Sequence, residues 1–404
     1  MLNLLKKTTP WMVASLFVAT SLFGQGQEAS PKPCPPKCEP KCAPQPKCPP
    51  KPCPKPCPQP CPPTQVCPAD QTPCCPSWST PVLNAAYNYP ARTRTRCPWD
   101  FDAFASFIYW QPIQENMELG LSNTTATPGT DLHASVINMD FNYKPGFKVG
   151  MGGYFDYDNW DLQLQYTWFH NTQKQNFDAE EVGQVIQSRG TAFLDGSAAT
   201  QYRSASQHWK LDMDIVDLDL GRWYYVGTKL TFRPSFGARA AWIGQKTETN
   251  YDNAVTDDFY DINKKSRSWA LGAKAALDTN WMLGSGFRMY GNGEADLLFT
   301  KYTRASYSAS HETAAGVVSD PVSVTQRRIY SVKPHLDLEL GFGWGTYVDC
   351  NNWYLDFSAG YGFQVFFDQN MFRSFNDDVS QGISTMPNGN LYIHGLTATF
   401  KLDF

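Results

Sequence analysis

The chain ends in a segment whose side chains alternate strictly between apolar and polar. Leu396, Ala398, Phe400, Leu402 and Phe404 are apolar, and the residues between them are polar. Because successive side chains of a strand point to opposite faces, this segment predicts a strand with one apolar and one polar face. A two-faced last strand with a terminal aromatic residue is typical of the strand that closes an outer-membrane β-barrel.

The same alternation recurs throughout the body of the chain. It is clearest over residues 162–168, 230–242, 269–277 and 336–344. The face opposite the apolar one carries many charges and glycines, which is unusual for a soluble sheet. Lipid outside and a polar lumen inside would produce this pattern. The sequence therefore predicts an all-β fold, an antiparallel transmembrane barrel.

Turn and loop lengths predict the number of strands. Short turns are expected at 156–159, 226–229, 279–285 and 348–352, and longer polar stretches at 120–131, 171–203, 247–266, 305–325 and 369–389. Short and long connections alternate, which gives ten strands, or twelve or more if the longest stretches hide hairpins. Bacterial barrels place short turns in the periplasm, so both ends of the barrel domain are expected there. One shift of phase, at Ile215–Val216, predicts a β-bulge.

Aromatic residues gather toward both ends of the expected strands, as the two membrane interfaces of a barrel require. One belt is expected from Trp160, Trp223, Tyr224, Trp281, Tyr347 and Trp353, and the other from Tyr109, Trp110, Trp168, Trp209, Trp242 and Trp269.

The region before the barrel divides in two. Residues 1–26 contain Lys6, Lys7 and an apolar run over 11–23, which predicts a secretory signal peptide. Residues 27–98 are rich in Pro, Cys and Lys, so we expect an extended periplasmic segment with nothing apolar to bury. Residues 25–98 carry nine Lys/Arg and three Asp/Glu, a net +6; with +2 on the signal peptide, the total of −4 leaves −12 for residues 99–404, the barrel.

Cysteines are concentrated in this segment. Export to an oxidising compartment makes disulfides the default expectation, and the candidates are Cys34, Cys38, Cys42, Cys48, Cys53, Cys57, Cys61, Cys67, Cys74, Cys75, Cys97 and Cys350. The leading hypothesis is that the arm cross-links neighbouring envelope proteins. Zinc binding by C-x3-C steps and local pairing in a plain spacer are the alternatives. A bridge between Cys97 and Cys350 across the periplasmic rim is a separate prediction.

Three segments carry a family resemblance: PGFKVGMGGYFDYDNWDLQLQYTW, DLDLGRWYYVGTKLTFRPSFGARAAWI and the terminal aromatic strand. They resemble the major-outer-membrane-protein-like, pore-forming proteins of Legionella and of the environmental relatives of chlamydiae. The resemblance covers most of residues 99–404 and implies an outer-membrane barrel with porin activity.

The polar face supplies the candidate lumen residues: Asp161, Asp212, Asp214, Asp217, Asp219, Arg222, Arg233, Arg239, Lys274, Arg288, Glu294, Asp296, Lys333, Asp337 and Glu339. Acidic residues are in excess, which favours small polar solutes with a mild preference for cations. The alternative is a structural or adhesive barrel whose narrow interior is filled by these side chains. The long loop from Asn171 to Arg203 is a candidate for surface recognition or for a constriction that folds into the lumen.

The remaining expectations concern chemistry and partners. No histidine forms a recognisable nucleophile or acid–base constellation, and His335 beside Asp337 is most simply an interior pair. We therefore expect no enzyme, no cofactor and no metal site in the barrel. The expected partners are outer-membrane lipid, neighbouring envelope proteins joined through disulfides, and further copies of the chain in a trimer. The acidic barrel argues against nucleic acid.

Overall fold

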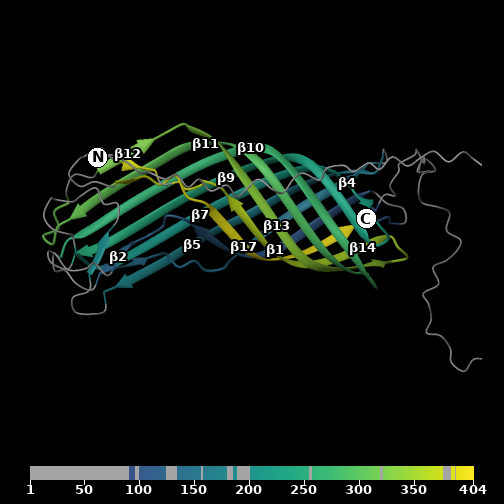
Figure 1. Ribbon diagram of the computed structural model, residues 1–404, viewed down its shortest axis with the longest axis horizontal. Helices are drawn as coiled ribbons and strands as arrows, with labels where there is room; N and C mark the ends of the chain where they lie inside the picture. The colour runs from purple at the N-terminus through teal and green to yellow at the C-terminus, as the bar shows by residue number, and fades with distance from the viewer. Residues whose placement is uncertain are drawn as a thin grey trace, which may run out of the picture. The chain divides into compact units, whose positions relative to one another are not determined.

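The computed structural model describes residues 91–95, 100–123, 134–155, 158–179, 185–188, 201–253, 257–318, 322–375, 384–386 and 388–404. Within these residues, ten long strands form one closed antiparallel barrel (Figure 1). They are β1 (Phe101–Gln114), β4 (Lys144–Tyr154), β5 (Trp160–Asp178), β7 (Gln201–Arg222), β9 (Leu230–Asn253), β10 (Phe259–Gly284), β11 (Phe287–Glu312), β13 (Ile329–Val348), β14 (Trp353–Phe366) and β17 (Leu391–Asp403). The predicted ten-stranded barrel is confirmed.

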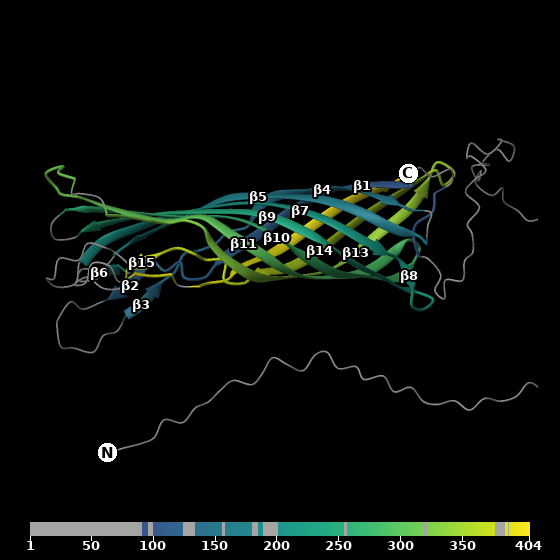
Figure 2. The same ribbon diagram turned by 90° about the horizontal axis from the view of Figure 1, so that it is seen from above.

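Seven short strands lie in the connections between the long ones. They are β2 (Gly120–Asn123), β3 (Ala134–Ile137), β6 (Val185–Ser188), β8 (Tyr224–Tyr225), β12 (Val322–Gln326), β15 (Ser374–Phe375) and β16 (Ser384–Thr385). Figure 2 shows β2, β3, β6 and β15 at the end of the barrel opposite the C-terminus. None of the described residues forms a helix long and apolar enough to cross a membrane.

The last strand closes the ring, as its pattern predicts. β17 pairs with β14 on one side and with β1 on the other, so that Leu396 lies opposite both Tyr361 and Tyr109. At the end of the seam, the Phe101 amide donates to the Phe404 carbonyl at 3.2 Å, and the Phe404 amide donates back at 3.0 Å. Every long strand therefore has two hydrogen-bonded neighbours, and the ring of described long strands has no open edge.

The outer face of the barrel carries a broad apolar band. On β13, Leu338, Leu340 and Phe342 are 61, 71 and 65% exposed. Exposed Trp242 and Trp281 lie toward opposite ends of this band, as aromatic residues at two membrane interfaces do. The belts differ from expectation at three tryptophans. Trp110 and Trp209 are buried inside the barrel, and Trp223 lines an interior cavity.

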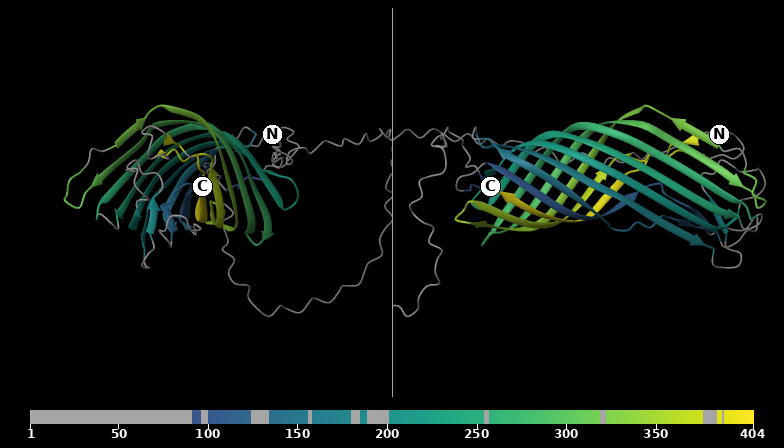
Figure 3. Two further views of the ribbon diagram at one scale, coloured as in Figure 1. Left: turned by 60° about the vertical axis from the view of Figure 1, so that its left-hand side comes forward. Right: turned by 180° about the vertical axis from the view of Figure 1, so that it is seen from behind.

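The barrel wall has unequal height. β1, β4, β14 and β17 have 14, 11, 14 and 13 residues, whereas β7, β9, β10 and β11 have 22, 24, 26 and 26. We call these two groups the short wall and the tall wall. In the right-hand view of Figure 3, the teal and green strands of the tall wall extend beyond the blue and yellow strands of the short wall. The prediction of a loop over residues 247–266 is therefore wrong. β9 and β10 extend into this stretch, and their connection covers only residues 254–258.

The expected bulge at Ile215–Val216 is also wrong. Ile215 lies opposite Thr167 and Val216 opposite Tyr166 in an unbroken register. Ile215 is buried inside the barrel and Val216 lies on the other face. The phase of the sequence pattern changes because the lining of the barrel changes from charged to apolar at this height, while the backbone continues regularly.

Candidate functional site

The candidate site is a polar chamber inside the short-turn end of the barrel. It has a volume of about 300 Å³ and is lined by inward-facing residues of all ten long strands and by Ala91, Arg92 and Thr93. Arg92 forms an ion pair with Asp100 at 2.9 Å and lies over the ring of Tyr154 at 5.3 Å. Residues 91–93 thus lie against the chamber.

Arg239 is the centre of the largest ion cluster in the chamber wall. Its guanidinium holds Asp217 through two hydrogen bonds, of 2.6 and 2.8 Å. It also binds Glu294 at 2.6 Å and Asp296 at 2.7 Å. His335 joins the cluster, with Nδ1 at 2.6 Å from Asp296. The cluster ties β7, β9, β11 and β13 together, and removing its single guanidinium would leave the buried Asp296 without a Lys or Arg partner among the described residues.

Lys274 on β10 extends this cluster toward the cavity. Its ammonium lies 2.9 Å from Asp219, 3.1 Å from Glu294 and 3.7 Å from Asp217. Because Lys274 and Arg239 share both Glu294 and Asp217, the two cations and four carboxylates form one network.

Further ion pairs brace the wall nearer the rim. Arg233 binds Asp161 at 2.5 Å and Asp278 at 2.9 Å. Arg288 binds Asp356, with one hydrogen bond of 2.7 Å. At the seam, Lys401 lies 3.3 Å from Asp102 and 3.1 Å from Asp403. Each cluster joins at least two strands, so these charges hold the wall together.

Some chamber charges lack a partner of opposite sign. Among the described residues, Asp337 and Glu339 line the cavity without an ion pair, and Glu339 accepts only a hydrogen bond from the Tyr290 hydroxyl at 2.7 Å. Lys148 also lines the cavity, with its ammonium 4.9 Å from the ring centre of Trp110. These three ionisable side chains line the cavity without a salt-bridge partner among the described residues.

Twelve of the fifteen candidate lumen residues lie on the inner face. These are Asp161, Asp217, Asp219, Arg233, Arg239, Lys274, Arg288, Glu294, Asp296, Lys333, Asp337 and Glu339. Lys333 lies above the chamber, 3.9 Å from Asp368.

Three candidates lie on the outer face, contrary to expectation. Asp214 accepts a hydrogen bond from the Tyr166 hydroxyl at 2.7 Å and lies 3.0 Å from His170. Asp212 pairs with Lys210 at 2.9 Å. Arg222 is at the rim, 3.0 Å from Asp158 in the turn before β5. The buried positions of β7 are odd-numbered over residues 205–217, so the even-numbered residues of this strand point outward.

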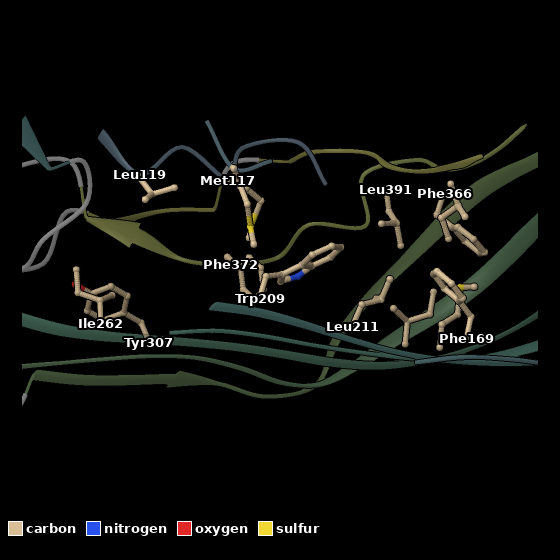
Figure 4. Packing of buried hydrophobic residues seen from close by; sticks show 14 of the residues in the cluster. Met117, Leu119, Phe169, Trp209, Leu211, Ile262, Tyr307, Phe366, Phe372 and Leu391 are labelled. Atoms are coloured by element: carbon tan, nitrogen blue, oxygen red, sulfur yellow. The ribbon is translucent and has the colours of Figure 1, made fainter. Parts of the chain in front are cut away.

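The outer half of the interior holds an apolar cluster, beside buried polar side chains such as Gln207 and Thr247. Trp209, Leu211 and Met213 are fully buried on the tall wall. Chain segments that follow the short strands cover them, with Met117 and Leu119 after β1 and Phe372 after β14 (Figure 4). The segment from Asn171 to Arg203, expected as a site of surface recognition or a constriction, begins and ends in strands: β5 continues to Asp178 and β7 begins at Gln201. Residues 180–184 and 189–200 lie outside the described residues, so the expectation stays a prediction.

A polar bridge crosses the interior within the apolar cluster, at the level where Gln245 lies opposite Leu211. Gln245 Nε2 on β9 donates to Gln114 Oε1 on β1 at 2.9 Å, and the Trp209 indole donates to Gln245 Oε1 at 3.3 Å. Both glutamines are buried. Sequence reasoning missed this bridge, because two glutamines 131 positions apart give no local signal.

The histidines and cysteines provide little further chemistry. His335 is an interior residue, but its partners are Asp296 and Arg239 rather than the expected Asp337. In the part of the chain that the structure describes, no group of three or more His, Cys, Asp or Glu could hold a metal ion. Cys350 is in the turn between β13 and β14. The ten arm cysteines and Cys97 lie outside the described residues.

Three solved structures are similar to this chain at low sequence identity. The outer membrane protease OmpT from Escherichia coli is 10% identical, covering 76% of this chain and 97% of its own, with a TM-score of 0.37. A Pseudomonas aeruginosa FadL homologue is 8% identical, with coverages of 75 and 89% and a TM-score of 0.26. A major outer membrane protein from Thermus thermophilus is 14% identical, with coverages of 74 and 99% and a TM-score of 0.22.

No curated protein matches the chain. The family model described as the Legionella pneumophila major outer membrane protein precursor matches residues 93–404, which is the whole barrel. This match agrees with the resemblance seen in the strand motifs and with the closed barrel. The chain belongs to the Legionella major outer membrane protein family, and it is an outer-membrane β-barrel.

Proposed function

We propose that this barrel is a gated porin that passes small polar solutes and ions, with a preference for cations. The observation that carries the proposal is the polar chamber, a charged cavity inside a barrel whose outer face is apolar. A barrel that only anchored a surface domain would need no charged cavity of about 300 Å³. The described residues after β1 and β14 that pack on the apolar cluster, among them Met117, Leu119 and Phe372, are the proposed gate.

The preference for cations follows from the charges in and around the chamber. Carboxylates outnumber cations there, so the local potential is negative and raises the concentration of cations. The carboxylates are Asp102, Asp161, Asp217, Asp219, Asp278, Glu294, Asp296, Asp337, Glu339, Asp356 and Asp403, and the cations are Arg92, Lys148, Arg233, Arg239, Lys274, Arg288 and Lys401.

A closed structural or adhesive barrel is the second candidate, and the apolar cluster favours it. Trp209, Phe169 and Phe366 fill the interior as large, fully buried side chains. Interiors packed in this way resist water. The two candidates therefore differ in whether the segments that cover the tall wall ever leave it.

Conductance of the purified barrel in planar bilayers separates the two candidates. A porin produces discrete current steps under an applied voltage, whereas a closed barrel produces none at any voltage. Folded protein must be verified in the same preparation by the difference in gel mobility between unheated and heated samples. Folded protein without steps would overturn the porin.

We also propose that residues 1–26 are a signal peptide and that residues 27–98 form a periplasmic arm whose cysteines cross-link neighbouring envelope proteins. The regular cysteines on a proline-rich cationic segment support this. Non-reducing gels of native envelopes should show a ladder of cross-linked species that reductant converts to monomer. Monomer under both conditions would contradict the proposal. Assembly into trimers, which would bring three arms together, is measured as the mass of the detergent-purified complex.

The proposed bridge between Cys97 and Cys350 rests on the geometry of the rim. Asp100 is three residues beyond Cys97, and β1 reaches the turn of Cys350 across only β17 and β14. Two strand spacings are roughly 10 Å, and three residues can span about that distance. Peptide mapping without reductant should yield one linked pair of peptides containing these two cysteines.

A further inference from the structure

The outer face of the tall wall carries positive charges that take no part in the ion clusters of the interior. On β10, Lys265 and Arg267 face outward, because the buried positions around them are Ser266, Ser268 and the other even-numbered residues. On β11, Lys301 and Arg304 occupy the corresponding outward positions. We call Lys265, Arg267, Lys301 and Arg304, together with Lys246 on β9, the cationic patch.

Like charges lie directly opposite one another in this patch. Lys265 pairs in register with Lys246 on one neighbouring strand, and Arg267 pairs with Arg304 on the other. Directly opposed like charges destabilise a sheet. Arg327 and Arg328 add two exposed cations at the corner where β13 begins. An anion bound on the outer face would offset the repulsion between these opposed cations.

Few carboxylates offset the patch. Lys246 pairs with Glu248, and Lys301 lies 5.5 Å from the ring centre of Tyr330. Among the described residues, Lys265, Arg267 and Arg304 form no ion pair. Asp261 faces the same side higher on β10, where its carboxylate bonds to the Asn263 amide at 3.0 Å.

The height of the patch identifies the anion. Trp242 and Trp269 lie opposite each other on the outer face, and Lys301 shares their row. Arg267 is two residues above Trp269, or about 7 Å along the strand. Outward tryptophans mark the level of the lipid headgroups, so the cations stand where the phosphates of the outer leaflet lie. Lys and Arg bind phosphate through charge-assisted hydrogen bonds.

We propose that the cationic patch is a binding site for the phosphate groups of an outer-leaflet glycolipid, held against β9, β10 and β11. The glycolipid would seat its phosphates between the Arg267–Arg304 and Lys246–Lys265 pairs and its acyl chains along the apolar band below. The opposite wall lacks such a site in its described residues, because no lysine or arginine is among the outward-facing residues of β1, β14 and β17.

Native mass spectrometry of the detergent-purified protein with bis-phosphorylated lipid A tests this site. The double variant R267Q/R304Q should lose at least about tenfold in affinity, since each cation near a charged lipid surface contributes measurably. The control R94Q/K229Q removes two exposed cations at the short-turn end, before β1 and in the β8–β9 turn, and should bind as the wild type does. Gel mobility of unheated samples verifies that both variants are folded.

Two further probes identify the recognised group. Phosphate-free lipid A should bind the wild type at least about tenfold more weakly than the bis-phosphorylated form does. This difference between the two lipids should be smaller for R267Q/R304Q, which keeps only the Lys246–Lys265 pair. Inorganic phosphate at millimolar concentration should not displace the lipid. Equal binding of the two lipids by the wild type, unchanged affinity in R267Q/R304Q, or displacement by inorganic phosphate would each overturn the proposal.

Discussion

Gln114 and Gln245 meet inside the barrel, where the side-chain amide of Gln245 donates to the side-chain oxygen of Gln114 at 2.9 Å. The two residues come from β1 in the short wall and β9 in the tall wall. Their hydrogen bond therefore crosses the interior of the barrel within the apolar cluster, on the outer side of the polar chamber.

Removing this bridge should loosen the closed state. The variant Q114A/Q245A loses the hydrogen bond across the interior and frees the indole of Trp209 from its partner. We expect faster swelling of liposomes that contain the variant when they are diluted into a small sugar. The control Gln163→Ala changes a chamber residue away from the bridge and should swell as the wild type does. Equal rates for all three proteins would show that the bridge does not restrict passage.

Arg239 should be the most costly cation to remove. Arg239→Gln leaves Asp217, Glu294 and Asp296 without their shared guanidinium, and breaking a buried ion pair costs roughly 3–5 kcal/mol. Lys148→Gln is the matched control, because Lys148 faces the same chamber without an ion pair among the described residues, so about 1 kcal/mol or less is expected. Urea unfolding followed by tryptophan fluorescence measures both, and equal midpoints would contradict the role of the cluster.

Ion selectivity should depend on the two chamber carboxylates that lack cationic partners among the described residues. D337N/E339Q removes negative charge that faces the cavity without breaking an ion pair. The reversal potential in a KCl gradient should move toward zero, because cations are then less favoured over anions. D349N/E312Q removes two exposed carboxylates at the two ends of the barrel and should keep the wild-type value. A reversal potential that moves equally in both variants would point to surface charge instead.

Closure of the seam should depend on Gly395. A β-carbon at this position would lie 2.3 Å from the backbone carbonyl oxygen of Tyr109 on β1. Gly395→Ala should therefore lower the fraction of protein that assembles into the heat-modifiable barrel. Gly227→Ala, in an exposed turn with no atom within 4 Å of the added carbon, should assemble normally. Normal assembly of both variants would show that β1 and β17 can separate locally.

The sequence predicts the barrel well because lipid imposes a strict alternation on its outer face. Its predictive power ends where the strands leave the membrane. At Leu211 and Met213 the apolar residues face inward and the polar ones outward, which reverses the rule that holds below Ile215. For the same reason Asp214 and Asp217, on one strand, lie on opposite faces. The polar 247–266 stretch resembles a loop because its outward face is in water.

The interior contacts could not be read from the sequence for a different reason. Arg239 and Asp296 are 57 positions apart, and their contact depends on the closed ring bringing β9 and β11 to the same chamber. The alternating pattern places each of them on the inner face. It does not determine how far along the barrel axis each side chain lies, because the strands are tilted. The covering of the tall wall by Met117, Leu119 and Phe372 likewise depends on the unequal lengths of the strands.

Single-channel recording in planar bilayers tests the central claim most directly, because it asks whether a folded barrel of this chain conducts. The account predicts discrete, cation-preferring steps for the wild type and a higher open fraction for Q114A/Q245A. Folded protein that gives no steps in either form, at any voltage, would contradict it.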